Sequence, residues 1–163
     1  MPRTATDAET RSASADHAAI RLWLRMLATN RLIETRMRRL LQERHQTTLP
    51  RFDLMAQLER VPGGLKMGEL SKRMMVTGGN VTGITDMLER EGLVERVDDP
   101  DDRRAWLVKL TPAGRRAFVS MAREHERWVV EALSALGARE MSAMAGFLGR
   151  LKTHVRSLEG RDA

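Results

Sequence analysis

The sequence predicts a mainly α-helical protein that carries one small β-hairpin. Most of the chain has apolar residues spaced three and four apart, which is the period of an amphipathic helix. After Gly92 the period changes to two, the period of a strand, and a second such stretch follows an acidic turn. The chain has no cysteine, so its fold cannot depend on disulfides or on thiolate metal sites.

The N-terminal residues 1–15 have no such period. They are rich in alanine, threonine, serine and charged residues, so we predict a flexible arm. They lack the hydrophobic segment of a secretory signal, and no apolar run of the chain approaches the roughly 18–20 residues that span a bilayer. These features predict a cytoplasmic protein without a membrane partner.

A long helix is predicted from Ala18 to Arg44. It carries two apolar stripes. One consists of Ile20, Trp23, Leu24 and Leu27, and the other of Leu22, Met26, Ile33, Met37 and Leu40. A monomer of 163 residues cannot easily cover both faces of so long a helix. One stripe is therefore expected to meet a partner subunit.

Two short helices should follow. The first opens at Thr48–Pro50, where threonine is a candidate N-cap and proline stands in the first turn, and it ends at Pro62–Gly64. The second turns Leu70 and Met74 inward, although its start lacks a serine or threonine cap.

A third short helix is predicted from Gly79 to Glu91, between a candidate N-cap at Thr77 and a stop at Gly92. Its inward face is Val81, Ile84 and Leu88. Its outward face consists of Gly79, Asn80, Thr82, Gly83 and Asp86, with Thr85 at the edge. Each helical glycine costs about 1 kcal/mol relative to alanine. The glycines therefore either permit the close approach of another molecule or mark a loop where no helix forms.

A β-hairpin comes next. Residues 93–97 and 106–110 alternate as strands, and the acidic run 98–102 is expected to form a long charged tip. Arg103 and Arg104 follow this run, and Asp101 or Asp102 can pair with such an arginine. The acidic run lacks the spacing of a calcium loop, so no metal site is predicted.

Two long helices complete the chain. Thr111 and Pro112 form an N-cap and first-turn pair that opens the first of them, and Gly137 ends it. Its apolar stripe consists of Phe118, Met121, Ala122, His125, Trp128, Val129, Ala132 and Leu136. The last helix has the spacing of a helix–helix seam, with Met141, Met144, Leu148, Leu151, Val155 and Leu158.

A short helix, a turn, a second capped helix and a hairpin, in this order, form a winged helix-turn-helix, whose second helix enters the major groove of DNA. Residues 47–111 would form this lobe, and residues 16–46 and 112–160 a helical dimerisation region. The candidate DNA-binding residues are Thr77, Gly79, Asn80, Thr82, Gly83, Thr85, Asp101, Arg103 and Arg104. A net charge of +6 and an isoelectric point near 10.8 favour a polyanionic partner, although arginine-rich helical surfaces are also often simply solvated.

Several segments resemble the MarR family of bacterial transcriptional regulators, over roughly residues 18–158. The resemblance rests on residues 70–75, Thr77–Thr85, Leu88–Arg96, Asp98–Arg104 and Leu110–Gly114. It implies a homodimer that binds a palindromic double-stranded DNA operator, mostly as a repressor, and that is released by a small ligand. Gly78 and Gly79 replace the serine–proline start that is common in the family, so base contacts there do not transfer. The absence of cysteine separates the chain from thiol-dependent members.

The Gly-Gly-Asn-Val-Thr-Gly start of the third short helix is similar to regulators of aromatic-acid catabolism, including a hydroxycinnamate group that responds to aromatic acyl-CoA. The candidate ligand-binding residues are Trp23, Leu27, Arg36, Met37, Arg38, Arg39, Phe52, Met55, Phe118 and Met121. The arginines would meet CoA phosphates, or else belong to a solvated face or contact DNA. The apolar members would line a pocket, or else simply fill the core.

An enzyme is not predicted. His17, His45, His125 and His154 lie far apart, and the chain has no phosphate-binding loop or Ser-His-Asp order. No cofactor is expected. Two other functions stay open, namely a constitutive or architectural DNA-binding protein without small-molecule control, and a protein-interaction module whose basic surface is incidental.

Overall fold

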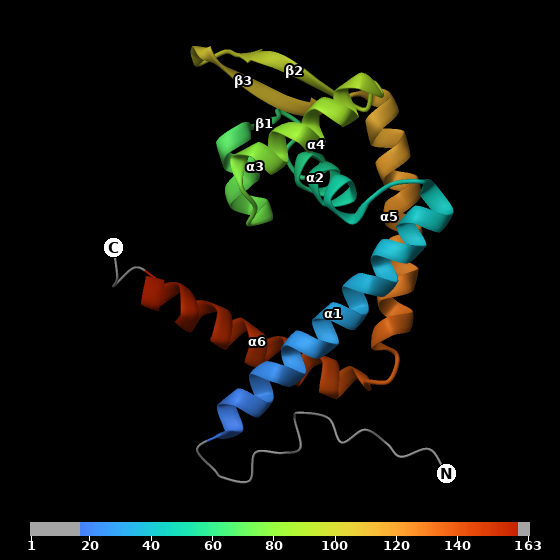
Figure 1. The fold of residues 1–163 in the computed structure, drawn as a ribbon, viewed down its shortest axis with the longest axis vertical. Coiled ribbons are helices and arrows are strands. Elements are labelled where there is room, and N and C mark those ends of the chain that lie inside the picture. Colours follow the sequence, from blue (N-terminus) through green and yellow to red (C-terminus); the bar gives the residue numbers. More distant parts are fainter. Residues whose placement is uncertain (1–16, 160–163) are drawn as a thin grey trace. The chain divides into compact units, whose positions relative to one another are not determined.

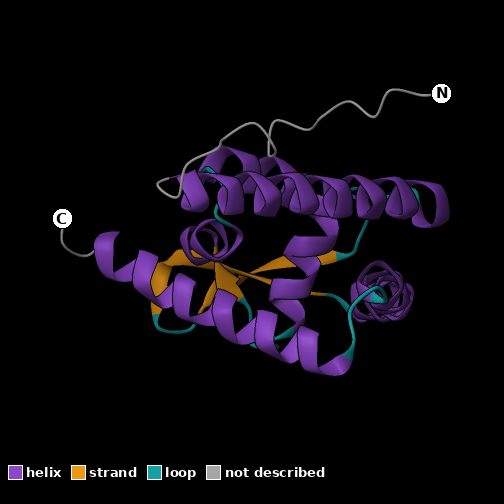
Figure 2. Cartoon of the chain, turned by 90° about the horizontal axis from the view of Figure 1, so that it is seen from below, coloured by secondary structure: helices purple, strands orange, loops and turns teal. Residues whose placement is uncertain are grey.

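The computed structural model describes residues 17–159, so the predicted N-terminal arm lies outside the described residues. Figure 1 shows the order of the elements, which is α1 (Ala18–His45), α2 (Leu49–Glu59), β1 (Leu65–Lys66), α3 (Met67–Met74), α4 (Gly78–Arg90), β2 (Val94–Asp99), β3 (Asp102–Leu110), α5 (Pro112–Leu133) and α6 (Ala138–Glu159). The strands form one small antiparallel sheet in the order β1-β3-β2 (Figure 2). A mainly helical fold with a small hairpin is therefore confirmed.

The chain divides into two compact units, residues 1–125 and 126–163. In its described part the first unit contains α1 to α4, the sheet and α5 as far as His125. The boundary falls inside α5, whereas the sequence predicts divisions near residues 46 and 111. The first helix and the beginning of α5 thus belong to the same compact unit as the predicted winged lobe.

The core of the first unit lies where α2, α3 and α4 meet the sheet. The fully buried apolar side chains come from every one of these elements, and they include Leu54, Met55, Leu58, Leu65, Leu70, Val81, Leu88, Val94 and Val108. The hairpin of β2 and β3 projects beyond the helices of this unit (Figure 1). The packed core therefore fixes the position of α4 relative to the base of the hairpin.

Two of the three predicted N-caps behave differently from expectation. Thr48 and Thr77 stand at the N-cap positions of α2 and α4 with extended backbones, but neither side chain makes a capping hydrogen bond. Thr111 does make a capping hydrogen bond, since its hydroxyl accepts the N–H of Gly114 at 3.0 Å. The same hydroxyl donates to the carbonyl of Gly92 at 2.7 Å. The Thr77 side chain thus leaves the first N–H groups of α4 without a side-chain cap.

Strand β1 is not predicted by the sequence. Leu65 pairs with Val108 and Lys66 with Leu107, so the hairpin becomes a three-stranded sheet. Gly64 precedes the strand with φ of 97°, and a Cβ there would lie 2.9 Å from the Val108 carbonyl oxygen. Two residues are too few to show an alternating pattern in the sequence. Only the pairing with β3 defines this strand.

The prediction of a long hairpin tip is wrong. Regular pairing runs from Val94 opposite Leu110 to Asp98 opposite Trp106, and then Asp99 pairs with Asp102, so the tip is only Pro100 and Asp101. Residues 103–105 consequently have no pairing partner in β2 and form a bulge. The acidic residues can continue the strands because their carboxylates accept backbone N–H groups at the tip.

The second unit consists of the end of α5 and α6. The N–H of Gly137 donates to Glu140 Oε2 at 2.7 Å, which starts α6 after the predicted break. The predicted seam is exposed in the single chain, with fractions of 40 to 46% for Met141, Met144, Leu148, Leu151, Val155 and Leu158, and Phe147, which was not predicted, is 61% exposed. In the part of the chain that the structure describes, none of the helices combines the length and apolarity of a membrane-spanning segment.

Candidate nucleic-acid interface

Helix α4 forms despite its three glycines, which excludes the alternative that they mark a loop. Val81, Ile84 and Leu88 are buried as predicted, with exposed fractions of 6% or less, while Gly79, Asn80, Thr82 and Gly83 are exposed. A Cβ at residue 79 or 83 would meet nothing within 4 Å. The fold therefore does not require glycine at either position, and their effect is a smooth outward surface near the start of α4.

Thr85 is a correction to the predicted outward face. It is fully buried, and its hydroxyl donates to the Val81 carbonyl at 2.8 Å. The reason is that Thr85 lies one helical turn after Val81, so both point to the core. Thr82 stays on the outward face, where its hydroxyl donates to the Gly78 carbonyl at 3.0 Å.

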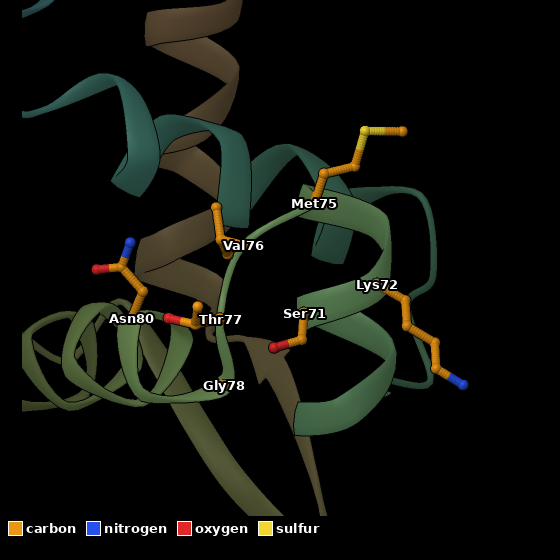
Figure 3. Close-up of a pocket in the computed structure, with 7 residues that line it drawn as sticks. All are labelled: Ser71, Lys72, Met75, Val76, Thr77, Gly78 and Asn80. Carbon is orange, nitrogen blue, oxygen red and sulfur yellow. The ribbon is translucent and has the colours of Figure 1, made fainter. Parts of the chain in front are cut away.

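A cavity of about 550 Å³ lies at the turn between α3 and α4. Figure 3 shows its lining residues, which are Ser71, Lys72, Met75, Val76, Thr77, Gly78 and Asn80. The predicted residues Thr77 and Asn80 thus share a hollow with the end of α3. Sequence reasoning did not single out Ser71, Lys72 or Met75, because residues on α3 give no pattern that distinguishes an interface from a solvated surface.

Two features of this turn stand out. Met75 adopts a left-handed backbone with φ of 55°, and the residue is 83% exposed. Ser71 Oγ is buried and makes no hydrogen bond within the described part of the chain, and a Cβ at Gly78 would lie 3.8 Å from it. The turn therefore combines an exposed thioether, a buried hydroxyl with spare hydrogen-bonding capacity and the N–H groups at the start of α4.

Acidic residues on α4 are neutralised from the hairpin. Arg96 on β2 forms ion pairs with Asp86, at 2.5 Å, and with Glu89. The hydrogen bond with Asp86 is the largest cause of a raised pKa at Arg96. The guanidinium thus offsets the negative charge of the outward edge of α4, which would otherwise repel a polyanion.

At the hairpin tip the predicted residues lie close together in the chain but have different surroundings. Asp101 is exposed, and its N–H donates to Asp99 Oδ1 at 2.9 Å. Arg104 is exposed, and its N–H donates to Asp102 Oδ1 at 3.0 Å. Arg103 belongs to β3, and its side chain is outside the described part of the structure. Among the side chains that the structure describes, the cation that pairs with acidic residues here is Lys66, which the sequence did not indicate.

The predicted ligand-binding residues separate into two groups. Phe52 stacks on Phe118 with ring centroids 5.5 Å apart, and it contacts His125 at 4.6 Å. Met37, Met55 and Met121 are also buried in this unit. Burial lowers the pKa of His125. These residues pack as a core, which agrees with the plainer of the two interpretations of the apolar set.

The remaining members lie along α1. Trp23 is 59% exposed, and Leu27 and Arg36 are half-buried. Arg38 and Arg39 are exposed and pair with Glu34 and Glu43, one turn away on the same helix. Such pairs are typical of a solvated helical face.

Comparisons with known proteins agree with this geometry. The model of the MarR family matches residues 47–106. The chain is 30% identical over 95 residues to the uncharacterised HTH-type transcriptional regulator YdgJ of Bacillus subtilis, a match that covers 58% of each protein. It spans about three fifths of the length of the curated relatives it matches.

Solved structures resemble the chain over most of its length. A MarR family transcriptional regulator from Silicibacter pomeroyi is 33% identical with a TM-score of 0.72, over 88% of this chain and 99% of that one. Sco3205 of Streptomyces coelicolor, solved in complex with DNA, is 24% identical with a TM-score of 0.74, over 90% and 91%. These relatives are transcriptional regulators and not enzymes, as the sequence predicts for this chain.

Proposed function

The chain belongs to the MarR family, and from this premise we propose that it is a homodimeric transcriptional repressor that binds a palindromic operator in double-stranded DNA. Helix α4 enters the major groove, and the hairpin reaches the flanking minor groove.

The exposed start of α4 carries this proposal. Its inward face is buried, so the helix has one fixed orientation, and its outward face presents Asn80 and Thr82 between glycines. Asparagine and threonine can donate and accept at base edges. The glycines let the backbone approach closely, and N–H groups without a side-chain cap at a helix start attract phosphate oxygens.

The proposed homodimer is supported by the apolar surface of α6. Seven of its apolar side chains are exposed by 40% or more in the single chain, including Phe147 at 61%. Contiguous apolar surface of this kind is costly in water and marks an interface. A second copy of the chain is the occupant that the family resemblance implies, because palindromic operators match a two-fold symmetric protein.

We further propose that a small aromatic acid or aromatic acyl-CoA releases the protein from DNA. The resemblance to regulators of aromatic-acid catabolism suggests this class of effector. The packed rings of Phe52, Phe118 and His125 lie beside buried methionines, whose flexible side chains would have to repack to make room for such a ring. The alternative is constitutive DNA binding without small-molecule control.

Fluorescence anisotropy with labelled duplex DNA tests the DNA-binding proposal. The logarithm of the affinity should fall steeply and linearly with the logarithm of the salt concentration, because basic residues displace condensed cations. Asn80→Ala should relax sequence preference more than it lowers affinity for random DNA. A wild-type protein without salt-sensitive attraction to duplex DNA would exclude the proposal.

Two measurements test the remaining parts. Sedimentation equilibrium should give a dimer, and a chain ending after Gly137 should lose it; a monomeric wild-type protein would exclude the dimer. Thermal-shift screening of aromatic acids and their CoA thioesters, followed by DNA-release assays, distinguishes a ligand-controlled regulator from a constitutive one. If no compound of either class shifts the melting temperature or releases DNA, the constitutive alternative holds.

A further inference from the structure

An ion pair connects the hairpin tip to β1. Lys66 Nζ lies 2.8 Å from Asp99 Oδ2 and 3.9 Å from Asp102 Oδ2. Asp99 ends β2 and Asp102 begins β3, so one ammonium group bridges the two strands where they meet. The side chain of Asp99 is only 5% exposed, whereas that of Lys66 is half exposed.

The Asp99 carboxylate also shapes the tip itself. Its Oδ1 accepts the N–H of Asp101 at 2.9 Å, which closes the two-residue turn, while its Oδ2 meets the ammonium of Lys66. The hydrogen bond with Lys66 is the largest cause of a lowered pKa at Asp99, and the same bond raises the pKa of Lys66. Both groups therefore stay charged across the physiological range, and a carboxylate this buried needs such a partner.

The bulge at residues 103–105 follows directly after the turn that Asp99 closes. Because Asp99 pairs with Asp102 while Asp98 pairs with Trp106, residues 103–105 lie outside the regular ladder with β2. A bulge changes the direction in which a strand presents its side chains. This segment contains Arg103 and Arg104, which the sequence predicts to bind DNA, and its backbone lies outside the pairing with β2.

We infer that Lys66 is a positioning residue for DNA binding: its ion pair with Asp99 fixes the closed hairpin tip and thereby the direction of the bulge that carries Arg103 and Arg104. The inference rests on the proposed function. Lys66 acts through Asp99 and does not itself bind phosphate, since its ammonium is committed to the two carboxylates. The preceding strand pairing makes this possible, because Lys66 is held in register opposite Leu107.

Lys109 offers a matched control. It lies on β3 of the same sheet and pairs with Glu95 at 3.4 Å, and its side chain is partly exposed like that of Lys66. Lys66→Met and Lys109→Met each remove one positive charge from the sheet. They therefore lower the general attraction to DNA by similar amounts, whereas only Lys66→Met releases the tip.

The experiment combines amide hydrogen exchange with DNA binding in the full chain. In Lys66→Met the amides of Asp101 and Arg104 should exchange about tenfold faster than in wild type, while those of Lys109→Met should not change. Affinity for a duplex that wild type enriches from a random library should fall about tenfold further in Lys66→Met than in Lys109→Met. Lys66→Arg should keep the exchange rates of the tip and the DNA affinity near their wild-type values, because it keeps the charge and the donor.

Each outcome bears on either the role of Lys66 or the proposed DNA binding. Unchanged tip exchange in Lys66→Met overturns the inference, and so does faster exchange with an affinity loss equal to that of Lys109→Met. A wild-type protein that enriches no duplex overturns the proposed function, while the exchange measurement still decides whether Lys66 holds the tip. If Lys66→Met does not fold, Lys66→Ala, which also removes both the charge and the donor, gives the same test.

Discussion

A Cβ on residue 114 would lie 1.8 Å from the carbonyl oxygen of Leu93, so only glycine fits where α5 begins beside the start of β2. The same junction is closed by two hydrogen bonds of Thr111, whose N–H donates to the Leu93 carbonyl at 3.1 Å and whose hydroxyl donates to the Gly92 carbonyl. The base of the hairpin and the start of α5 are therefore joined by contacts with no spare volume.

Gly114→Ala should lower the free energy of unfolding by about 3 kcal/mol or more, because the added methyl forces backbone to move. Urea unfolding measures this change. Gly68→Ala is the matched control, since a Cβ in this first turn of α3 would meet nothing within 4 Å. Equal stabilities of the two variants would contradict the close contact at Leu93.

Gly83→Ala should change stability and DNA binding in opposite directions. The added Cβ meets nothing in the folded chain, and alanine favours a helix by about 1 kcal/mol, so the melting temperature should rise. The same methyl occupies the surface proposed to face the major groove, so affinity for the enriched duplex should fall by about 1 kcal/mol. Anisotropy titrations and thermal unfolding of the same preparation give both values. Unchanged affinity would place residue 83 outside the interface.

Arg96→Met should weaken both folding and DNA binding. It removes the link between β2 and α4 and leaves the carboxylates of Asp86 and Glu89 without their cation. These groups are partly exposed, so we expect about 1 kcal/mol of stability to be lost. Arg73→Met removes an equal charge from an exposed pair with Glu69 within α3 and is the control.

The two arginine variants should differ in DNA affinity as well. Uncompensated acidic residues on α4 repel DNA, so Arg96→Met should bind the duplex more weakly than Arg73→Met, and the difference should shrink at high salt. Equal affinities at low salt would show that the Arg96 pairs do not affect the interface.

The stability of the protein should decrease in acid because of His125. Burial lowers its pKa below the ordinary histidine value of 6.5, so the unfolded chain binds this proton more readily than the folded chain. The stabilisation is thus complete above the unfolded pKa and is lost as pH falls through the folded pKa. Wild type should lose more stability than His125→Phe between about pH 8 and about pH 5.5 in urea unfolding. Parallel losses would assign the acid sensitivity to other groups.

The sequence by itself determined the elements whose hydrogen bonds are local. The apolar spacing of Val81, Ile84 and Leu88 identified the buried face of α4, and the Thr111–Pro112 pair identified the start of α5. Gly92, with φ of 69°, ends α4 as predicted. Helix periodicity and end signals are encoded within one or two turns of chain, so they can be read from neighbouring residues alone.

Only the tertiary structure decided the features that join distant segments. Strand β1 exists because it pairs with β3, and Lys66 meets Asp99 from 33 positions earlier in the chain. Such contacts depend on how packed elements bring remote residues together, and no local pattern carries that information.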